Sequence, residues 1–134
     1  MIIEGGCYCG RIRYRIEGAA RKALQCHCRE CQYISGGHPN VTMSFAAGDV
    51  KFTRGTPKSF ARQDVPQPMT RLFCADCGTH LGTRSPRRPD GINIKVGTLD
   101  DPDVYRPQIA IHIDDRQPFH QIGDDVERFR RWPA

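Results

Sequence analysis

Three of the seven cysteines in this 134-residue chain fall within one short stretch, "CHCREC". Cys26, Cys28 and Cys31 supply three thiols, and thiolates are strong zinc ligands. A structural zinc takes four protein ligands, whereas a catalytic zinc keeps three and leaves one position for water or substrate. The triplet therefore predicts a catalytic zinc site. Zinc bound by three thiolates is a soft Lewis acid, which suits the binding of a substrate thiol as its thiolate.

Other interpretations of the triplet stay open. A histidine could complete it as a closed structural site, the candidates being His27, His38 and His80. The triplet could also be free of metal, or Cys28 and Cys31 could form a redox-active dithiol. Because His27 lies between two ligands, we expect its side chain to point away from the metal. His80 and His112 occupy alternating strand positions, so we expect core histidines that at most support the zinc site indirectly.

The remaining cysteines form two short pairs, "CYC" at 7–9 and "CADC" at 74–77, each followed by a glycine that suits a tight turn. Two short chelating pairs from distant segments commonly supply a four-thiolate structural zinc site. We predict such a site from Cys7, Cys9, Cys74 and Cys77. It would close a loop of more than sixty residues and so stabilise a chain with a thin core. A different pairing of the same groups is the alternative.

Short strands must position these cysteines. A hydrophobic fraction of 38%, with 10 prolines and 13 glycines, is typical of a loop-rich fold. Period-two alternation predicts strands in "RIRYRIEG", in "NVTMSFAAGDVKFTRG" on both sides of a turn at 47–49, and in "KSFARQ", "MTRLFC", "THLGTRS", "INIKVGTL" and "QIAIHI". Residues 29–34 and the tail "DDVERFRRW", capped by Asp124, favour short helices. The sequence thus predicts a mainly β protein with a single domain over residues 1–134.

The net charge and the hydropathy of the chain exclude some classes of binding partner. The formal net charge is +5. Seven thiolates and two zinc ions together contribute three negative charges and leave about +2. No run of basic and aromatic residues suggests a nucleic-acid partner. No stretch reaches the roughly 18 apolar residues of a membrane span, and the N-terminus lacks a signal-peptide pattern. We therefore expect a cytoplasmic protein, in which clustered thiols are metal ligands rather than disulfides.

The chain resembles the glutathione-dependent formaldehyde-activating enzyme family, which includes centromere protein V. The matching motifs span residues 5–113: "GGCYCGRIRYRIEG", "CHCRECQYISGG", "RLFCADCGTHLGTRS" and "INIKVGTLDDPDVYRPQIAIHI". The resemblance implies a β-tent fold of small antiparallel sheets around a structural zinc. It also implies two zinc ions per chain, the structural one bound by Cys7, Cys9, Cys74 and Cys77 and the catalytic one by Cys26, Cys28 and Cys31.

The same resemblance implies a carbon–sulfur lyase that condenses glutathione with formaldehyde to S-hydroxymethylglutathione. Two segments depart from the family. Relatives often continue after the triplet with a small residue, proline and phenylalanine, where this chain has 37–40 "GHPN". Many also have an aromatic-rich segment where this chain has "DDRQPFHQI". Glutathione specificity therefore does not carry over, and the expected substrates are a small thiol and an aldehyde.

A mechanism follows as a hypothesis. The thiolate attacks the aldehyde carbonyl, and His38, which is near the triplet in sequence, donates the proton to the new hydroxyl. Arg29 and the backbone of residues 35–37 orient a carboxylate-bearing thiol. Two other classes of function remain as alternatives. One is a non-catalytic zinc module that contacts protein or nucleic acid, and the other is a thiol-redox or metal-handling protein.

Overall fold

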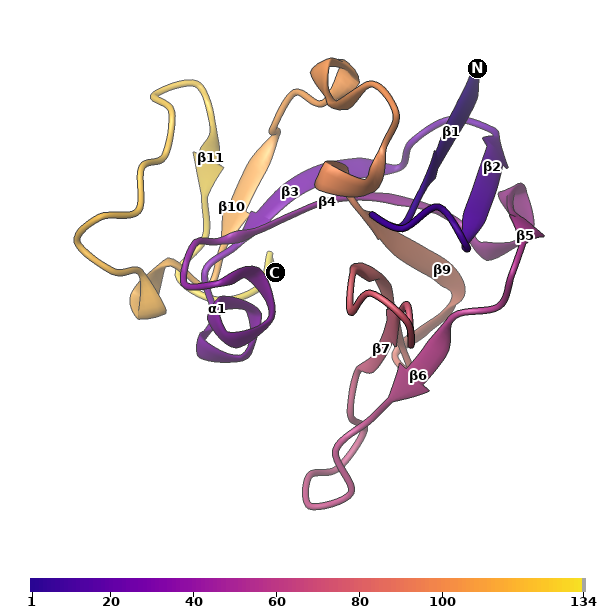
Figure 1. Cartoon of the computed structure of the whole chain (residues 1–134). Coiled ribbons are helices and arrows are strands. Elements are labelled where there is room, and N and C mark those ends of the chain that lie inside the picture. Colours follow the sequence, from indigo (N-terminus) through magenta and orange to yellow (C-terminus); the bar gives the residue numbers. More distant parts are fainter. Residues whose placement is uncertain (134) are drawn as a thin grey trace.

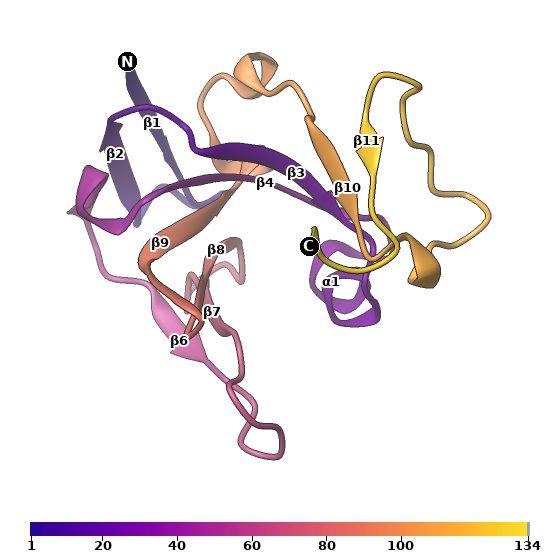
Figure 2. The ribbon, with the colours of Figure 1, turned by 180° about the vertical axis from the view of Figure 1, so that it is seen from behind.

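The computed structural model describes residues 1–133, which form two β-sheets and one α-helix (Figures 1 and 2). The mainly β prediction is confirmed. Strands β1 (Ile2–Gly6), β2 (Arg13–Glu17) and β5 (Val50–Arg54) make a three-stranded antiparallel sheet in the order β1-β2-β5. No helix within residues 1–133 is long and apolar enough to cross a membrane.

The second sheet has eight strands in the order β11-β10-β3-β4-β9-β8-β7-β6. Its pairs are antiparallel except for β3–β10 and β10–β11, which are parallel. Their bounds are β3 (Lys22–Cys26), β4 (Asn40–Ala46), β6 (Lys58–Phe60), β7 (Thr70–Phe73), β8 (His80–Ser85), β9 (Arg88–Lys95), β10 (Ile109–Ile111) and β11 (Glu127–Arg128).

The register gives the eight-stranded sheet one apolar face and a second, mixed face. The second face is polar on β4, β9, β8 and β7, whereas on β3 and β10 it carries Leu24, Cys26, Ile109 and Ile111 of the second hydrophobic cluster. Directly opposed residues share a face, so Met43 of β4 lies beside Ile94 of β9. This apolar face packs with Ile3, Tyr14 and Ile16 of the smaller sheet in the main core. The other face carries a row of polar side chains from four strands, and all but Asn93 are buried: Asn40, Thr42, Lys95, Asn93, Thr83 and Arg71.

Helix α1 (Arg29–Ser35) confirms the helix predicted at 29–34. It begins directly after Cys28, which caps it, and ends at Gly36 in the left-handed conformation with φ 80°. Short 3₁₀ turns complete the connections, and their bounds are η1 (Ala47–Asp49), η2 (Val96–Thr98), η3 (Pro102–Val104) and η4 (Ile113–Asp115).

The helix predicted in "DDVERFRRW" is wrong, because this segment is extended and contributes β11. The Glu127 N–H donates to the Gln108 carbonyl and the Phe129 N–H to that of Ala110. Pairing with β10 buries Val126 and packs Phe129 against the second hydrophobic cluster, so tertiary contacts outweigh helix propensity. The strands on both sides of η1 are confirmed, but β4 and β5 belong to different sheets.

Candidate functional site

Four sulfurs meet where the β1–β2 turn approaches the β7–β8 turn. The ligand atoms of Cys7, Cys9, Cys74 and Cys77 all lie within 4.8 Å of one another. The Cys7 and Cys9 sulfurs are 3.6 Å apart, and those of Cys9 and Cys74 are 3.9 Å apart. In tetrahedral coordination with zinc–sulfur bonds of about 2.3 Å, the sulfurs are separated by about 3.8 Å. The donor set and its spacing therefore fit zinc.

Tight turns shape this cysteine tetrad. Gly78 takes φ 76°, a conformation that favours glycine, and its N–H donates to the Cys74 carbonyl over 2.8 Å. The Ile12 N–H donates to the Cys7 sulfur over 3.2 Å, and the hydroxyl of Thr79 lies 3.1 Å from the Cys77 sulfur. Hydrogen bonds from these donors to cysteine sulfur stabilise the thiolate form that binds a metal.

The other three sulfurs form a triad at the junction of β3 and α1. Cys26 is the last residue of β3, Cys28 caps the helix, and Cys31 lies in its first turn. The N–H of Cys31 donates to the Cys28 sulfur over 3.3 Å. The three ligand atoms lie within 4.8 Å of one another, and within residues 1–133 no histidine, further cysteine or carboxylate joins the group.

The triad differs from the tetrad in its surroundings and in its protonation. Cys26 and Cys31 are buried in the second hydrophobic cluster. Hydrogen bonds from the Cys26 and Cys28 thiols lower the pKa of Cys31 to about 3 against the effect of burial. The contacts with Cys28 and Cys31, together with burial, raise the pKa of Cys26 far above its ordinary value. Three converging thiols of this kind fit a thiolate-binding metal with one position left for another ligand.

A buried lysine outside the predicted site residues approaches the triad. The Asn40 amide nitrogen lies 3.7 Å from the Cys31 sulfur, and the Lys95 ammonium donates to the Asn40 side-chain oxygen. Lys95 is 8% exposed, and burial lowers its pKa to about 8. The signal was a lysine inside the apolar strand "INIKVGTL", at a position that shares a face with Thr42.

Arg71 approaches the same helix from β7. Its guanidinium is 3.7 Å from the Glu30 carboxylate, and Glu30 precedes Cys31 in the first turn of α1. Arg71 is only 7% exposed, whereas the Glu30 side chain is 56% exposed. A second mostly buried cation therefore lies beside the first turn of α1, which also carries Cys31.

The histidine between the triad cysteines turns away from them, as expected. His27 is fully buried, and its Nδ1 lies 2.9 Å from Nδ1 of His120. His120 donates through Nε2 to the Gly37 carbonyl, so its Nδ1 is the acceptor and the Nδ1–H of His27 donates. Burial lowers the pKa of His27 to about 4, followed by the effect of His120. His27 is therefore neutral near pH 7.

Gln32 joins the helix to the segment that follows β10. Its amide nitrogen donates to the carbonyls of His27 and Asp115 over 2.8 and 3.0 Å. Its oxygen accepts from the Gln117 side chain over 3.1 Å. Gln32 is 3% exposed, so this network holds α1, and with it two of the three sulfurs, against the C-terminal part of the chain.

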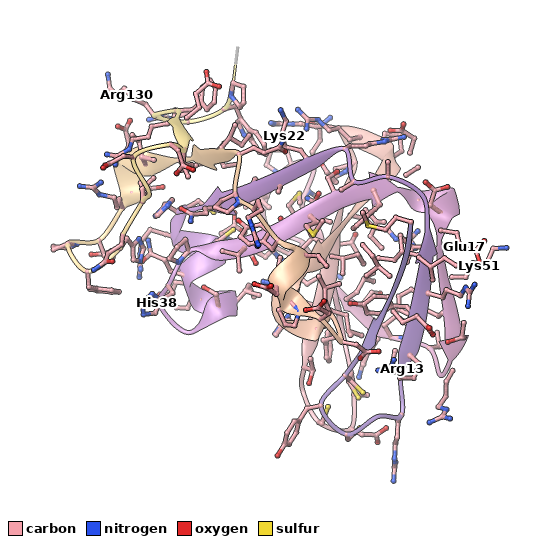
Figure 3. All side chains as sticks on the ribbon, turned by 90° about the horizontal axis from the view of Figure 1, so that it is seen from above. Arg13, Glu17, Lys22, His38, Lys51 and Arg130 are labelled. Atoms are coloured by element: carbon pink, nitrogen blue, oxygen red, sulfur yellow. The ribbon has the colours of Figure 1, made fainter. Side chains whose placement is uncertain are left out.

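The other histidines of the predicted site lie apart from the triad. The exposed His38 follows α1 at the rim of the molecule (Figure 3) and packs against the rings of Phe119 and His120, with centroids 5.6 and 6.1 Å away. The ring of His80 packs against Phe73 and that of His112 against Trp132. None of these histidines joins the triad within the part of the chain that the structure describes.

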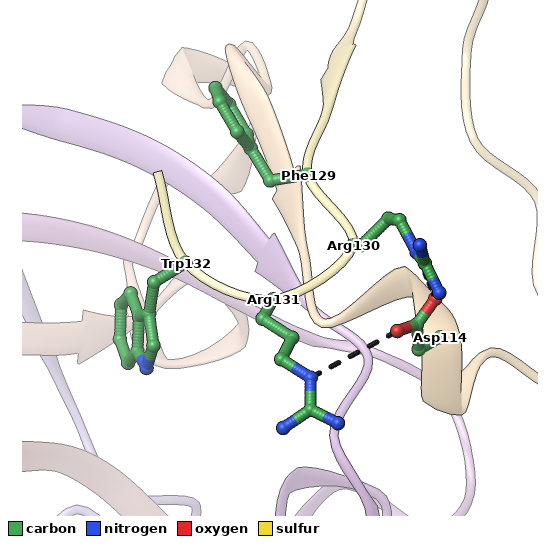
Figure 4. Close-up of a pocket in the computed structure, with 5 residues that line it drawn as sticks. All are labelled: Asp114, Phe129, Arg130, Arg131 and Trp132. Carbon is green, nitrogen blue, oxygen red and sulfur yellow. Dashed lines mark hydrogen bonds and ion pairs between the residues drawn. The ribbon is translucent and has the colours of Figure 1, made fainter. Parts of the chain in front are cut away.

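Two pockets lie near these elements. One of about 310 Å³ lies between α1, β6 and β7, and its lining includes Arg29, Tyr33, Phe60, Met69 and Arg71. The second, of about 400 Å³, is formed by the C-terminal segment and is shown in Figure 4; Asp114, Phe129, Arg130, Arg131 and Trp132 line it. No cysteine lines either pocket, but the first adjoins the helix that carries Cys31.

Comparisons with known proteins bear on the family and on the fold. The family model described as "Glutathione-dependent formaldehyde-activating enzyme" matches residues 2–115. A Halomonas elongata protein, provisionally named a glutathione-dependent formaldehyde-activating enzyme, is 25% identical over 118 residues, covering 84% of this chain and 74% of the relative. A crystal structure of a Rhodobacter sphaeroides protein superposes with a TM-score of 0.62 at 19% identity, covering 78% of this chain and 96% of that one. This last likeness concerns the fold alone.

Proposed function

This chain belongs to the glutathione-dependent formaldehyde-activating enzyme family, and from that premise we propose that it is a carbon–sulfur lyase. The proposed reaction is the reversible addition of a small thiol to an aldehyde. We propose Cys26, Cys28 and Cys31 as the ligands of its catalytic zinc. Cys7, Cys9, Cys74 and Cys77 are the proposed ligands of a structural zinc.

The observation that carries this proposal is the difference between the two sulfur groups. Four thiols in the tetrad leave a zinc ion no free position, because structural zinc is four-coordinate. Only three thiols converge in the triad, and no histidine or carboxylate within residues 1–133 completes them. A closed structural site would need that fourth ligand, so the triad supports a site at which a substrate binds.

The reaction forms a carbon–sulfur bond and an O–H bond, and it breaks the thiol S–H bond and the π bond of the carbonyl. The thiolate sulfur donates an electron pair to the carbonyl carbon, the π electrons pass to oxygen, and the oxygen takes up a proton to give a hemithioacetal. Zinc bound by three thiolates would supply a position that holds the substrate thiol in its anionic form near neutral pH. Cys31, whose pKa is already low, and its neighbours would hold this ion.

The rest of the thiol substrate would occupy the pocket of about 310 Å³ beside α1. Arg29 lines it and stacks on Tyr33, its guanidinium carbon 5.2 Å from the ring centroid. Arg62 also lines the pocket but is paired with Asp64 over 2.7 Å. Arg29 is therefore the better candidate to bind a carboxylate of the thiol, as the sequence suggested.

We propose His38 as the proton donor, because it lies near the triad in sequence, in the connection between α1 and β4. It follows Gly37, whose carbonyl accepts from His120. Its imidazole is exposed and packs on Phe119, so reaching the bound aldehyde requires a rotation of the side chain. Substitution decides this assignment, as described below.

The proposal is tested by exchange NMR on the zinc-loaded protein with glutathione and formaldehyde. We expect adduct formation and breakdown to exceed the spontaneous rate. The Cys28→Ser/Cys31→Ser variant, with its tetrad intact, is the matched control and should show only the spontaneous rate. If the wild type accelerates the addition of neither glutathione nor another cellular thiol, the lyase proposal is wrong.

A further inference from the structure

Lys95 is a buried cation without a carboxylate partner. It is 8% exposed, in the middle of the eight-stranded sheet, and its hydrogen bond goes to the neutral amide of Asn40. None of the ion pairs within residues 1–133 includes Lys95. Lysine is rarely buried unless an opposite charge compensates it, so the compensating anion must lie nearby.

The triad supplies that anion. Asn40 and Cys26 are opposed in the register of β3 and β4, and Thr42 and Lys95 in that of β4 and β9. These four residues therefore share one face of the sheet. The Asn40 amide places its oxygen on the Lys95 ammonium and its nitrogen 3.7 Å from the Cys31 sulfur. One amide group thus separates the ammonium from the thiols.

The net charge of the zinc-loaded triad best balances the nearby cations when a substrate thiolate occupies the fourth position. Three thiolates with one zinc ion carry a single net negative charge, and a bound substrate thiolate raises it to two, whereas water leaves it unchanged. Two buried cations face the triad, Lys95 through Asn40 and Arg71 beside Glu30. The exposed Glu30 already offsets part of the charge of Arg71, so Lys95 has the larger uncompensated charge.

We propose that Lys95 and Asn40 are positioning residues that make the triad select a thiolate in preference to water. This inference rests on the proposed function. Lys95 supplies a fixed positive charge on the face of the sheet that carries Cys26. Asn40 transmits it by orienting its N–H toward Cys31, which stabilises negative charge on sulfur. The pair acts through the cysteines and does not itself react.

Thiol binding tests this proposal without turnover. The protein is loaded with cobalt(II), and 2-mercaptoethanol is titrated while the sulfur-to-cobalt absorption is followed. We expect Lys95→Met to weaken thiol binding about tenfold or more, the scale seen when a group supporting a metal ligand is removed. Lys95→Arg keeps the charge and should recover most of the affinity. Lys51→Met, at an exposed position beside Glu17 (Figure 3), is the matched control and should bind like the wild type.

Metal retention gives an independent measurement. Under a graded chelator challenge, Lys95→Met should lose its triad zinc at a lower chelator concentration than the wild type, while the tetrad zinc is retained. Asn40→Asp serves if Lys95→Met does not fold, because it keeps the shape and the acceptor for Lys95 but removes the N–H donor. We expect Asn40→Asp also to weaken thiol binding about tenfold.

Thiol affinity and zinc retention within twofold of the wild type in these variants would overturn the inference. So would loss of both zinc ions at the same chelator concentration, since that indicates a general loss of structure. If the wild type fails to accelerate thiol addition, the proposed function fails. The thiol-binding and zinc-retention results would still decide the role of Lys95.

Discussion

Among single residues, His27 makes the stability of the folded protein depend on pH. The folded protein holds the pKa of His27 near 4 through burial, against about 6.5 for an unperturbed histidine. As the pH falls below 6.5, the unfolded chain binds the proton first. The free energy of unfolding therefore decreases between pH 6.5 and 4, and the contribution of His27 is complete only above that window.

His27→Gln should remove this pH dependence. Each pH unit inside the window corresponds to about 1.4 kcal/mol for one group. Between pH 7 and pH 5 we expect the wild type to lose about 2 kcal/mol more than the variant. Denaturant unfolding of the zinc-loaded wild type and variant at pH 7 and pH 5 measures the two losses. Both proteins have the same cysteines, so the effect of proton binding by the cysteines cancels when the losses are subtracted. Equal losses would show that His27 is not held neutral.

His38→Ala tests the proposed proton donor. Loss of a general acid typically lowers a rate by a factor of about 10² to 10⁴. We expect kcat for adduct formation to fall by about 10² while the KM for the thiol changes little. Phe119→Leu is the control, because it removes the ring that packs on His38 and keeps the imidazole. An unchanged kcat in His38→Ala would assign the proton transfer to another group or to water.

The sequence allowed the two groups of thiols to be predicted, because ligand spacing is local in the chain. It did not show Lys95, Asn40 or His120 as neighbours of the triad. These contacts depend on strand register and on a segment 93 residues away from His27. The alternation in "NVTMSF" and "INIKV" is consistent with a shared face for Asn40, Thr42 and Lys95.

At the scale of elements, helix α1 positions two of the triad sulfurs and depends on its ends. Cys28 caps its first turn, and Gly36 ends it with φ 80°. No heavy atom lies within 4 Å of a Cβ built at Gly36, so only the backbone conformation opposes a larger residue there. The position of Cys31 thus depends on a helix of two turns.

Gly36→Ala should lower the free energy of unfolding by about 1 kcal/mol, because alanine in the left-handed region is strained. Gly97→Ala is the control: a Cβ there also meets no atom within 4 Å, and the φ of Gly97 is not positive. We expect it to change stability by less than about 0.5 kcal/mol. Denaturant titration of both variants measures the comparison, and equal effects would contradict the assignment of strain to Gly36.

Gln32→Ala should loosen the helix from the rest of the chain. The substitution leaves the carbonyls of His27 and Asp115 without their donor. Each carbonyl that stays buried without a donor lowers the free energy of unfolding by about 1–3 kcal/mol. We expect faster amide hydrogen exchange over residues 27–36 and easier loss of the triad zinc. Tyr33→Ala, at an adjacent residue that is 80% exposed, should change neither. Unchanged exchange in Gln32→Ala would show that other contacts hold α1.

Strands and the first helix could be predicted because their periodicity is local, whereas pairing between distant segments could not. The tail at 124–132 has a weak helical period, but β10 offers a free edge on which its backbone groups are satisfied. Strands β1 and β3 were missed because their sequences, "IIEGG" and "KALQC", show no clear alternation of apolar and polar residues. The separation of β4 from β5 into two sheets likewise depends on the whole fold.

Across the whole molecule, the two sulfur groups belong to different hydrophobic clusters. Cys7 and Cys74 lie in the main core between the two sheets, and Cys26 and Cys31 lie in the smaller cluster beside α1. The tetrad links a turn near the N-terminus to one past the middle of the chain, so a metal ion bound there would oppose separation of the sheets. The triad joins neighbouring elements only.

Cys74→Ser and Cys31→Ser form a matched pair, since the two residues are 1% and 6% exposed. We expect Cys74→Ser to lower the free energy of unfolding by about 5 kcal/mol or more and to abolish the cooperative transition. It removes a metal ligand, and the free energy of metal binding at a structural site contributes directly to folding. Cys31→Ser should keep a cooperative transition and lose activity. Thermal unfolding followed by circular dichroism measures both, and equal destabilisation would contradict the division of roles.

The most direct test of the central claim is the zinc content of the purified protein and of its Cys28→Ser/Cys31→Ser variant. Division of the seven sulfurs into a closed tetrad and an open triad predicts two zinc ions per wild-type chain. The variant should retain one zinc ion and the folded spectrum. A single zinc ion in the wild type, or loss of both ions from a folded variant, would contradict the account.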